Sequence, residues 1–342
     1  MIRVGVVGLG MMGLTHLDAY TGMADVEVTA IADANPARLS GEVKAKGNVE
    51  GQAQGRFDFA KVKKFSDGKD LVRDTDVDVV DICLTTPLHL DFALATIAAR
   101  KPMLIEKPLA RTAQQADQIA KAAKEAGVIA MPAMCMRFWP GWTWLKRAIS
   151  EREYGKVFAA HFRRLATHPG GTFYADGAAS GAAALDLHIH DADFVRYCFG
   201  DPISVHSRGY SKITSGIDHL ITQYQYGDVP LVTAEGGWAM ADGYPFRMQY
   251  TVNFERATAV FDSAAQLPLC LYEKGLPPRA LELEPQMGYQ REIEYFINCV
   301  KENRPPTAVT LEDGAEAVRL VEAEVESIRI GWPVLPTGAK VS

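Results

Sequence analysis

The chain has 342 residues, of which 48% are hydrophobic and 23% are charged, and its formal net charge is −6. This length exceeds what one hydrophobic core usually serves, so we expect two domains. Acidic and basic residues are spread along the chain, which argues against nucleic acid or an anionic membrane as a partner, because both require concentrated positive charge.

The apolar runs and the cysteines indicate the cellular compartment in which the protein is expected to lie. No apolar stretch approaches the roughly 20 residues that a membrane span needs, and the strand-like run after Arg3 does not resemble a signal peptide. The five cysteines are scattered and none forms a CxxC pair, which is typical of a reducing environment. We therefore expect a cytoplasmic protein that does not bind membranes.

The first third of the chain alternates short, β-branched apolar runs with stretches of helical periodicity. Strands are expected at Ile2–Val7, Val26–Ala32, Val77–Leu84, Pro102–Ile105 and Val128–Ala133. Helices are expected at Met12–Thr21, Pro36–Lys46, Pro87–Arg100 and Thr112–Ala126, with a polar surface excursion at Gly47–Lys64. This alternation predicts an α/β domain with a parallel sheet covered by helices on both faces.

A glycine motif follows the first of these strands. Gly8, Gly10 and Gly13 form a GxGxxG pattern that directly follows a strand and opens a helix, the context that a dinucleotide-binding turn demands. The first glycine permits the turn, the second lets the backbone approach a pyrophosphate, and the third lets the helix pack closely. The helix N-terminus, with Met11 and Met12, then faces the phosphates. One turn further along, His16 is expected to be a packing residue.

The end of the second strand predicts which dinucleotide binds. Asp33 lies about 20 residues past Gly13, where a carboxylate holds the ribose hydroxyls and repels a 2′-phosphate. NAD is therefore favoured over NADP. Arg38 is close enough in sequence to weaken that preference, so NADP remains an alternative.

After a helix that begins near Pro140, the sequence is typical of a strand-rich second domain. Strands are expected at Val157–Leu165, Ile203–Ser211, His219–Tyr226, Leu231–Trp238, Arg247–Asn253 and Ala257–Phe261. They predict an α+β domain with a large, mostly antiparallel open sheet and helices on one side. The expected boundaries are residues 1–125 for the dinucleotide-binding domain and 126–342 for an α/β substrate and oligomerisation domain. A C-terminal helix at about 311–330, capped by Thr310 and Asp313, is expected to pack back toward the first domain.

Three further motifs carry a family resemblance. They are Glu106-Lys107-Pro108 at the end of a strand, Leu185-Asp186-x-x-x-His190-x-x-Asp193, and the late Tyr289-x-x-Glu292-x-x-x-Phe296. With the glycine motif, they make essentially the whole chain resemble the glucose–fructose oxidoreductase, inositol dehydrogenase and MocA (Gfo/Idh/MocA) family. The resemblance implies a Rossmann domain and an NAD(P)-dependent oxidoreductase. Such an enzyme transfers a hydride between the nicotinamide and a secondary hydroxyl of a sugar, inositol or related polyol.

The resemblance also implies roles for single residues. Lys107 matches the lysine that points at the nicotinamide and the reacting hydroxyl, and its bond to Pro108 is expected to be cis. Asp186 and His190 match the pair that completes the active site in inositol dehydrogenase-like members. The implied cofactor-binding residues include the glycine turn, Asp33, Arg38 and Lys107, which are described above. The resemblance adds Thr85, Thr86, Pro87, His89 and Glu106. In the family, the open sheet commonly forms a subunit interface, so a homodimer or homotetramer is expected.

The sequence departs from the family's pattern in two places. Leu88 and Asp91 stand where members often have Asn and His, which affects the fine cofactor contacts. His188 stands where members often have Gly, which suggests a modified substrate pocket. The candidates for substrate contact are Arg163, His168, Tyr174 and His188.

The Asp186–Asp193 segment also indicates chemistry of its own. On a helix from about Ala183 to Phe199, Asp186, His190 and Asp193 fall on one face. An acid one turn before a histidine can fix its tautomer and orientation. We therefore choose His190 as the general base and Asp186 as its orienting partner, while Lys107 hydrogen-bonds the hydroxyl and stabilises its anion. The reverse assignment, with Lys107 as the base and His190 positioning the substrate, stays open, since positive neighbours depress a lysine pKa.

Three other functions compete with this interpretation. A metal-dependent hydrolase would use His188 and His190, but a helix points them about 200° apart, so no metal is expected. A cofactor-binding sensor or regulator that has lost catalysis would be expected to lack Lys107 or His190, and both are present. An NAD-dependent glycosidase of the same family would share every motif described above.

Overall fold

The computed structural model describes residues 1–42 and 55–336, and the chain divides into two compact units. The first unit comprises Met1–Cys135 and Met287–Ala315. The second comprises Met136–Gln286 and the described residues from Glu316 on. This division differs from the expected boundary after residue 125, because ten more residues and a late segment of the chain join the first unit.

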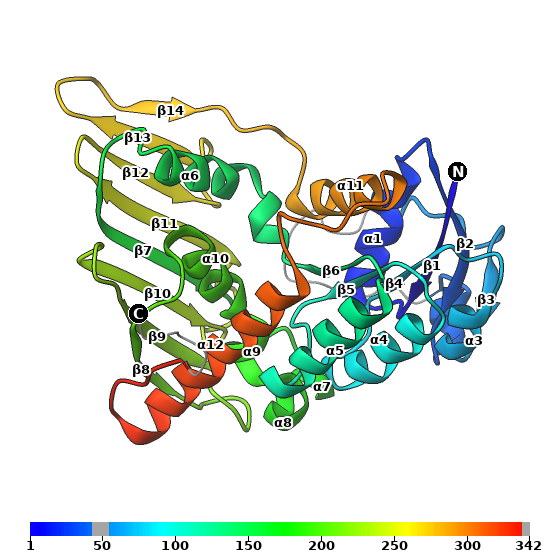
Figure 1. The fold of residues 1–342 in the computed structure, drawn as a ribbon. Coiled ribbons are helices and arrows are strands. Elements are labelled where there is room, and N and C mark those ends of the chain that lie inside the picture. Colours follow the sequence, from blue (N-terminus) through cyan, green and yellow to red (C-terminus); the bar gives the residue numbers. More distant parts are fainter. Residues whose placement is uncertain (43–54, 337–342) are drawn as a thin grey trace. The chain divides into compact units, whose positions relative to one another are not determined.

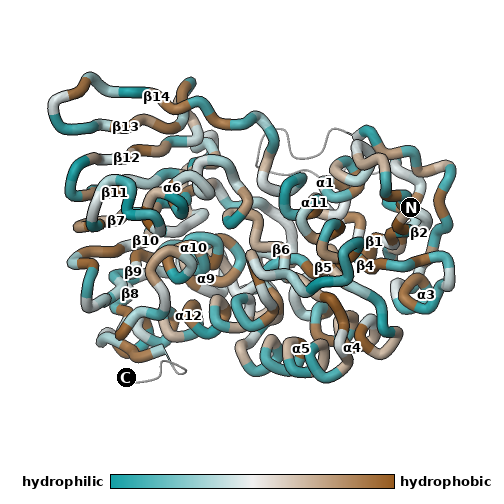
Figure 2. Tube along the Cα trace, turned by 45° about the horizontal axis from the view of Figure 1, so that its top comes forward, coloured by the Kyte–Doolittle hydropathy of each residue, from teal (hydrophilic) through white to brown (hydrophobic). Residues whose placement is uncertain are grey.

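Six parallel strands form the sheet of the first unit (Figure 1). They are β1 (Ile2–Val7), β2 (Val26–Ala32), β3 (Lys63–Phe65), β4 (Val79–Ile82), β5 (Met103–Glu106) and β6 (Ala130–Ala133). β1 and β4 are mostly apolar in Figure 2, as expected of strands covered on both faces. The order β3-β2-β1-β4-β5-β6 is the doubly wound order, in which ligands bind beyond the carboxyl ends of the strands where the winding reverses.

Helices connect and cover these strands. They are α1 (Met11–Thr21), α2 (Pro36–Leu39), α3 (Gly68–Arg73), the 3-10 helix η1 (Thr86–Leu88), α4 (His89–Ala98), α5 (Ala113–Ala126), α11 (Gly288–Lys301) and the start of α12 (Leu311–Ile330). In α5, Thr112 caps the start by accepting a hydrogen bond from the backbone of Gln115, and the left-handed Gly127 ends the helix. Ala116, Ile119 and Ala123 bury its apolar face against the sheet.

The late segment completes the core of the first unit. α11 packs against α1, and Leu311 and Ala315 of α12 join the same buried cluster as Leu109. The predicted cap of α12 is confirmed. Thr310 Oγ1 accepts from the backbone N–H of Asp313 at 3.1 Å, and the carboxylate of Asp313 accepts from the N–H of Thr310 at 3.0 Å. The expected C-terminal helix therefore begins within the first unit and continues into the second.

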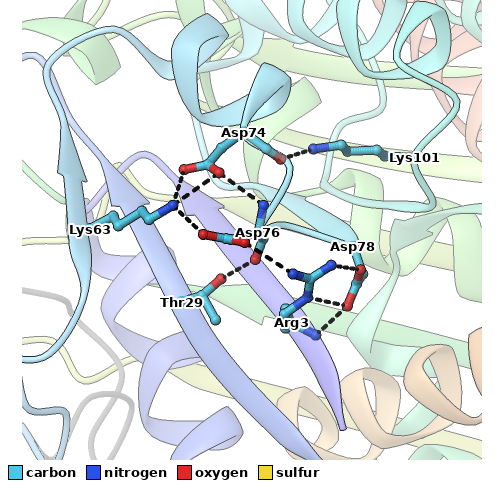
Figure 3. A network of polar contacts seen from close by, with 7 residues as sticks. All are labelled: Arg3, Thr29, Lys63, Asp74, Asp76, Asp78 and Lys101. Atoms are coloured by element: carbon cyan, nitrogen blue, oxygen red, sulfur yellow. Dashed lines mark hydrogen bonds and ion pairs between the residues drawn. The ribbon is translucent and has the colours of Figure 1, made fainter.

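A polar network ties together the amino ends of the same strands (Figure 3). Arg3 of β1 donates to both carboxylate oxygens of Asp78, at 2.6 and 3.0 Å. Lys63 of β3 contacts Asp74 and Asp76, which precede β4. These groups lie at the opposite edge of the sheet from the glycine turn, so we assign this network to stability and look for the ligand site at the carboxyl ends.

Eight strands form the sheet of the second unit, in the order β14-β13-β12-β11-β7-β10-β9-β8. They are β7 (Val157–Leu165), β8 (Ser204–Tyr210), β9 (His219–Gln225), β10 (Leu231–Gly237), β11 (Arg247–Phe254), β12 (Ala257–Asp262), β13 (Leu269–Glu273) and β14 (Arg279–Leu281). β7 and β10 pair in parallel, and the other neighbours pair antiparallel. The expected mostly antiparallel sheet is therefore confirmed.

Helices cover one face of this sheet. They are α6 (Pro140–Ser150), α7 (Thr172–Ala175), α8 (Gly177–Ser180), α9 (Ala182–Asp186) and α10 (Ile189–Phe199), preceded by the 3-10 helix η2 (Cys135–Phe138). Trp142 of α6 makes edge-on contacts with Phe194, Tyr250 and Phe261, which join two helices to two strands. On the opposite face, Ile221 and Tyr272 are exposed.

Several expected elements differ from those observed. β3 and α3 were not predicted, and neither were β13 and β14. The helix expected at Pro36–Lys46 ends at Leu39. The end of that range and the first part of the expected excursion at Gly47–Lys64 lie outside the described residues.

The helix expected from Ala183 to Phe199 is interrupted between Asp186 and His190. It divides into α9 and α10, and at the junction the backbone N–H of His188 donates to the carbonyl of Ala183, five residues back. This widened turn changes the rotation between the two residues, so the regular helical spacing does not apply across it.

Among the described residues, no helix combines the length and the apolarity that crossing a membrane requires.

Candidate functional site

The glycine turn adopts the geometry that its motif predicts. Gly8 has φ +93°, and a Cβ there would lie 2.5 Å from the carbonyl oxygen of Cys83 at the end of β4. A Cβ on Gly13 would lie 1.9 Å from the carbonyl oxygen of Gly8, so only glycine lets α1 pack this closely on the turn. A Cβ on Gly10, the N-cap of α1, would meet no atom within 4 Å. The backbone of Gly10 is therefore the open part of the turn.

The carboxylate of Asp33 is held by the backbone on both of its oxygens. Oδ2 accepts from the N–H of Leu9 inside the glycine turn at 2.8 Å, and Oδ1 accepts from the N–H of Asn35 at 2.8 Å. Arg38 Nη1 lies 3.5 Å from Oδ2, and its side chain is 40% exposed. Because a carboxylate oxygen accepts more than one hydrogen bond, Asp33 keeps capacity for ribose hydroxyls.

Lys107 follows the end of β5, two strands along the sheet from β1. The Lys107–Pro108 peptide bond is cis, as the resemblance implied. The backbone N–H of Lys107 donates to the carboxylate of Glu106 at 2.9 Å. Between Met103 and Ala110, Lys107 alone is partly exposed, whereas every other residue is buried. The local fold thus brings one amine to the surface at the carboxyl edge of the sheet.

The loop after β4 lies beside this turn. Thr86 is buried within η1, while Thr85 and Pro87 are exposed. His89 is fully buried, and its Nδ1 and Nε2 each lie 2.9 Å from a carbonyl oxygen, those of Pro108 and Leu84. This placement corrects the expectation that His89 binds the cofactor directly, because both ring nitrogens already face the protein backbone.

In the second unit, three buried polar contacts anchor the segment that carries His190. Asp191 accepts from Arg164 of β7 at 2.7 and 3.2 Å. Asp193 accepts from Arg137 at 2.9 and 2.6 Å. His188 Nε2 lies 3.2 Å from Glu324 of α12, whose other oxygen accepts from the hydroxyl of Tyr224 at 2.6 Å. These contacts fix the backbone on both sides of His190.

Accessibility separates the candidate catalytic pair from its neighbours. Between Ala182 and Val195, only Asp186 and His190 are partly exposed, and every other residue is buried. Partly exposed polar side chains in an otherwise buried stretch can be reached by a ligand. Lys107 belongs to the first unit, whereas Asp186 and His190 belong to the second.

The substrate candidates are distributed differently from the expectation. Arg163 donates to Glu235 at 2.8 Å on the exposed face of the sheet, whereas the adjacent Arg164 points to α10. Side chains alternate along a strand, so Arg163 lies across the sheet from the helix that carries His190. His188 is fully buried, and although burial lowers its pKa, the Glu324 carboxylate raises the pKa above the ordinary value. Arg163 and His188 are therefore corrected from pocket candidates to structural residues.

His168 and Tyr174 remain predictions as substrate residues. Both rings make edge-on contacts with the buried Trp238, at centroid distances of 5.2 and 6.0 Å. Both are partly exposed.

The residues of the glycine turn fit a nicotinamide dinucleotide. The open backbone of Gly10, at the start of α1, leaves room for a pyrophosphate against the N–H groups of the first helical turn. Met11 and Met12 form the first turn of α1 and are partly exposed there. Asp33, Thr86 and Lys107 lie at the ends of strands, or in the loops after them, along the same edge of the sheet.

Comparison with known proteins agrees with this geometry. A family model described as "Oxidoreductase family, NAD-binding Rossmann fold" matches residues 2–134. A second, described as "GFO/IDH/MocA C-terminal domain", matches residues 142–260.

Similar proteins match over nearly the whole chain. The myo-inositol 2-dehydrogenase of Thermotoga maritima is 27% identical and the scyllo-inositol 2-dehydrogenase (NAD(+)) of Bacillus subtilis is 25% identical. They cover 96% and 97% of this chain, respectively, and 96% of each relative is covered. Among solved structures, a levoglucosan dehydrogenase in complex with NADH and levoglucosan superposes with a TM-score of 0.85 at 20% identity. The match covers 98% of this chain and 99% of that one, and it confirms the fold of both units.

Proposed function

This chain belongs to the Gfo/Idh/MocA family of oxidoreductases, and from that premise we propose that it transfers a hydride between NAD and a secondary hydroxyl of a sugar, inositol or related polyol. The two family models confirm the resemblance, the NAD-binding Rossmann domain and the oxidoreductase class. The polyol substrate class is supported by the names of the full-length relatives, which are inositol dehydrogenases.

One observation carries the assignment to this chain. Lys107, Asp186 and His190 are the partly exposed residues of two otherwise buried stretches. The first stretch follows a Rossmann strand beside the cofactor turn, and the second is held rigid by buried ion pairs. A scaffold of this kind preorganises reactive side chains, which is what acid–base catalysis requires.

The chemistry divides between the bound cofactor and the residues of the chain. NAD, when bound, supplies the hydride acceptor. Lys107 donates a hydrogen bond to the substrate hydroxyl, and its positive charge stabilises the oxygen as its proton leaves. His190 accepts that proton, and Asp186 orients the imidazole. The reversed roles, with Lys107 as the base and His190 as the positioning group, remain the alternative.

The cofactor preference follows from Asp33 and Arg38. The carboxylate of Asp33, held by Leu9 and Asn35, would repel a 2′-phosphate and bind a 2′-hydroxyl. The partly exposed guanidinium of Arg38 would attract the same phosphate. We therefore infer that NAD is preferred and that NADP is used less efficiently.

The open sheet and the cysteines support two further inferences. We infer a homodimer or homotetramer formed through the exposed face of the second unit's sheet, where Ile221, Leu231 and Tyr272 present apolar area. Light scattering after gel filtration tests this oligomeric state, with Ile221→Glu expected to shift the mass toward the monomer.

All five cysteines are free, which supports a cytoplasmic location.

The function is tested by NAD reduction at 340 nm with myo-inositol, scyllo-inositol and levoglucosan. Lys107→Ala and His190→Ala should each lower kcat by about 100-fold or more, the contribution typical of acid–base groups. The matched control Lys121→Ala removes an exposed lysine of the same unit and should leave kcat unchanged. If His190 is the base, its variant also loses the acidic limb of the pH–rate profile. NADH binding without turnover of any polyol would favour a sensor or an NAD-dependent glycosidase.

A further inference from the structure

A cluster of fully buried polar side chains lies under the Lys107 turn within the first unit. His16 of α1 is 0% exposed, and its Nδ1 lies 2.8 Å from Oδ2 of Asp81 on β4. Its Nε2 lies 3.2 Å from Oε1 of Glu106 on β5. Oε2 of Glu106 accepts from the backbone N–H of Lys107. A continuous chain of contacts therefore runs from α1 to the backbone of Lys107.

The surroundings of His16 favour its charged form. Nδ1 forms a hydrogen bond with Asp81, whereas Nε2 lies 3.2 Å from a Glu106 oxygen without the geometry of a hydrogen bond. Two carboxylates close to the ring stabilise the imidazolium electrostatically. Burial alone would lower the pKa of His16, but the Asp81 carboxylate and its hydrogen bond raise the pKa well above its ordinary value.

The other groups that face this cluster are neutral or donate into it. The hydroxyl of Tyr20 donates to Asp81 at 2.9 Å. Burial raises the pKa of the Cys83 thiol, whose Sγ lies 3.4 Å from His16 Nδ1. Burial and the nearby Glu106 raise the pKa of Glu292 on α11 well above its ordinary value. The raised pKa favours the neutral form of Glu292.

The hydrogen bonds within the cluster favour a structural role over a metal site. Ligand atoms of His16, Asp81 and Cys83 lie within 4.8 Å of one another. However, the His16–Asp81 contact is already a 2.8 Å hydrogen bond, and Tyr20 donates to the same carboxylate oxygen. His16 and Tyr20 thus already occupy the Asp81 carboxylate, so the arrangement suits a positioning role.

A second buried histidine holds the same turn from another side. His89 Nδ1 lies 2.9 Å from the carbonyl oxygen of Pro108, and its Nε2 lies 2.9 Å from that of Leu84. Burial lowers the pKa of His89, which favours the neutral ring, and a neutral ring donates to only one of these two carbonyls. The ring packs between the residue after Lys107 and the loop after β4. Buried side chains therefore contact the backbone on both sides of the Lys107 side chain, Glu106 at the Lys107 N–H and His89 at the Pro108 carbonyl.

We propose that His16, acting through Glu106, is a positioning residue that fixes Lys107 for hydride transfer, with His89 as a second, independent hold on the same turn. The inference rests on the proposed function, in which Lys107 contacts the reacting hydroxyl. Displacing a reacting group by about 1 Å can lower the rate 100-fold without removing the group itself.

The test compares His16→Gln with wild type in the full-length protein. We expect kcat for the best of the three polyols to fall at least about 10-fold, with KM and the NADH Kd within about threefold. In hydrogen–deuterium exchange, the peptide that contains Lys107 should exchange at least about 10-fold faster, because without His16 the Glu106 carboxylate is less firmly held against the Lys107 amide. Arg3→Ala is the control for lost stability, since it breaks a network at the amino edge of the same sheet. It should leave both quantities unchanged.

Two outcomes would overturn the proposal. In the first, His16→Gln leaves kcat and the exchange of this peptide at wild-type values. In the second, Arg3→Ala changes them as much. If His16→Gln does not fold, two other measurements test the proposal. The first is kcat and exchange in His89→Gln, and the second is ¹⁵N NMR of histidine-labelled wild type. A neutral His16 ring at pH 7.5 would refute the positioning role of His16. If wild type turns over no polyol, the proposed function fails, while exchange and NMR still report on His16.

Discussion

Two glycines of the same turn should respond oppositely to one added methyl group. A Cβ on Gly13 would lie 1.9 Å from the carbonyl oxygen of Gly8, which is backbone and cannot rotate away. Gly13→Ala should therefore displace α1 and destabilise the protein by about 3 kcal/mol, the upper range for overpacking. A Cβ on Gly10 meets no protein atom within 4 Å. Its stability cost as an N-cap, about 0.5–1 kcal/mol, is offset by a similar entropic gain from the unfolded chain.

The effect on the cofactor should be reversed. The methyl group of Gly10→Ala occupies the space through which the backbone approaches the pyrophosphate. Losing one hydrogen bond to a charged group costs about 1.5–3 kcal/mol, which weakens NADH binding roughly 10- to 150-fold. Fluorescence titration with NADH and thermal melting monitored by circular dichroism measure the two effects separately. Wild-type NADH affinity in Gly10→Ala would refute the placement of the pyrophosphate, and an unchanged melt of Gly13→Ala would refute the packing argument.

Single contacts lead to three further predictions. Asp33→Ser should raise the ratio of kcat/KM with NADP to that with NAD at least about 10-fold, because repulsion of the 2′-phosphate disappears; adding Arg38→Ala should reverse the gain, and an unchanged ratio would contradict the role of Asp33. Glu292 has a raised pKa, so the native state keeps a proton that the unfolded chain loses, and stability falls by up to about 1.4 kcal/mol per pH unit above the unfolded pKa of about 4.3 until the native pKa is reached. Glu292→Gln removes this contribution, so urea melts at pH 5, 6.5 and 8 should show the variant gaining on wild type as pH rises, and parallel curves would count against a buried neutral acid. Asp193→Ala strands the buried guanidinium of Arg137 and should cost about 3–5 kcal/mol, whereas Asp201→Ala breaks an exposed pair with Arg196 and should cost less than about 1 kcal/mol in the same urea melts; equal losses would be inconsistent with the burial difference.

Local sequence signals predicted much of this fold. Apolar, β-branched runs located β1, β2 and β7 at their observed bounds. Burial on one or both faces of a strand requires apolar residues at the buried positions, and these residues are visible in the sequence. The glycine turn and the cap of α12 were predicted for a similar reason, since a left-handed φ or an orphan N–H restricts the residue that can serve.

Elements without a local signal were missed. β3 is three residues long and begins with two lysines, so its pairing with β2 comes from the sheet and not from its own periodicity. The break between α9 and α10 was missed because it accompanies the burial of His188 against Glu324, a residue far along the chain. The periodicity of residues 183–199 carries no information about a contact with Glu324.

The sequence predicted the partly exposed residues of the candidate site but not the roles of the buried histidines beneath it. Lys107, Asp186 and His190 came from motifs, and their roles remain predictions. His16 was interpreted as a packing residue and His89 as a cofactor ligand, because a sequence does not show which carboxylates and carbonyls surround a histidine once the chain folds. The buried Asp81 and Glu106 lie on two adjacent strands beside His16, and Asp81 raises its pKa.

The central claim, direct hydride transfer from a polyol carbon to NAD, is tested most directly with isotope. The protein is incubated with NAD and myo-inositol deuterated at every carbon, and the NADH formed is analysed by mass spectrometry. The account predicts NADH that carries one deuterium on the nicotinamide, and no such product with Lys107→Ala. NADH formed without deuterium would contradict direct transfer. Deuterium released to water without net NAD reduction would point instead to the family's glycosidase-type chemistry.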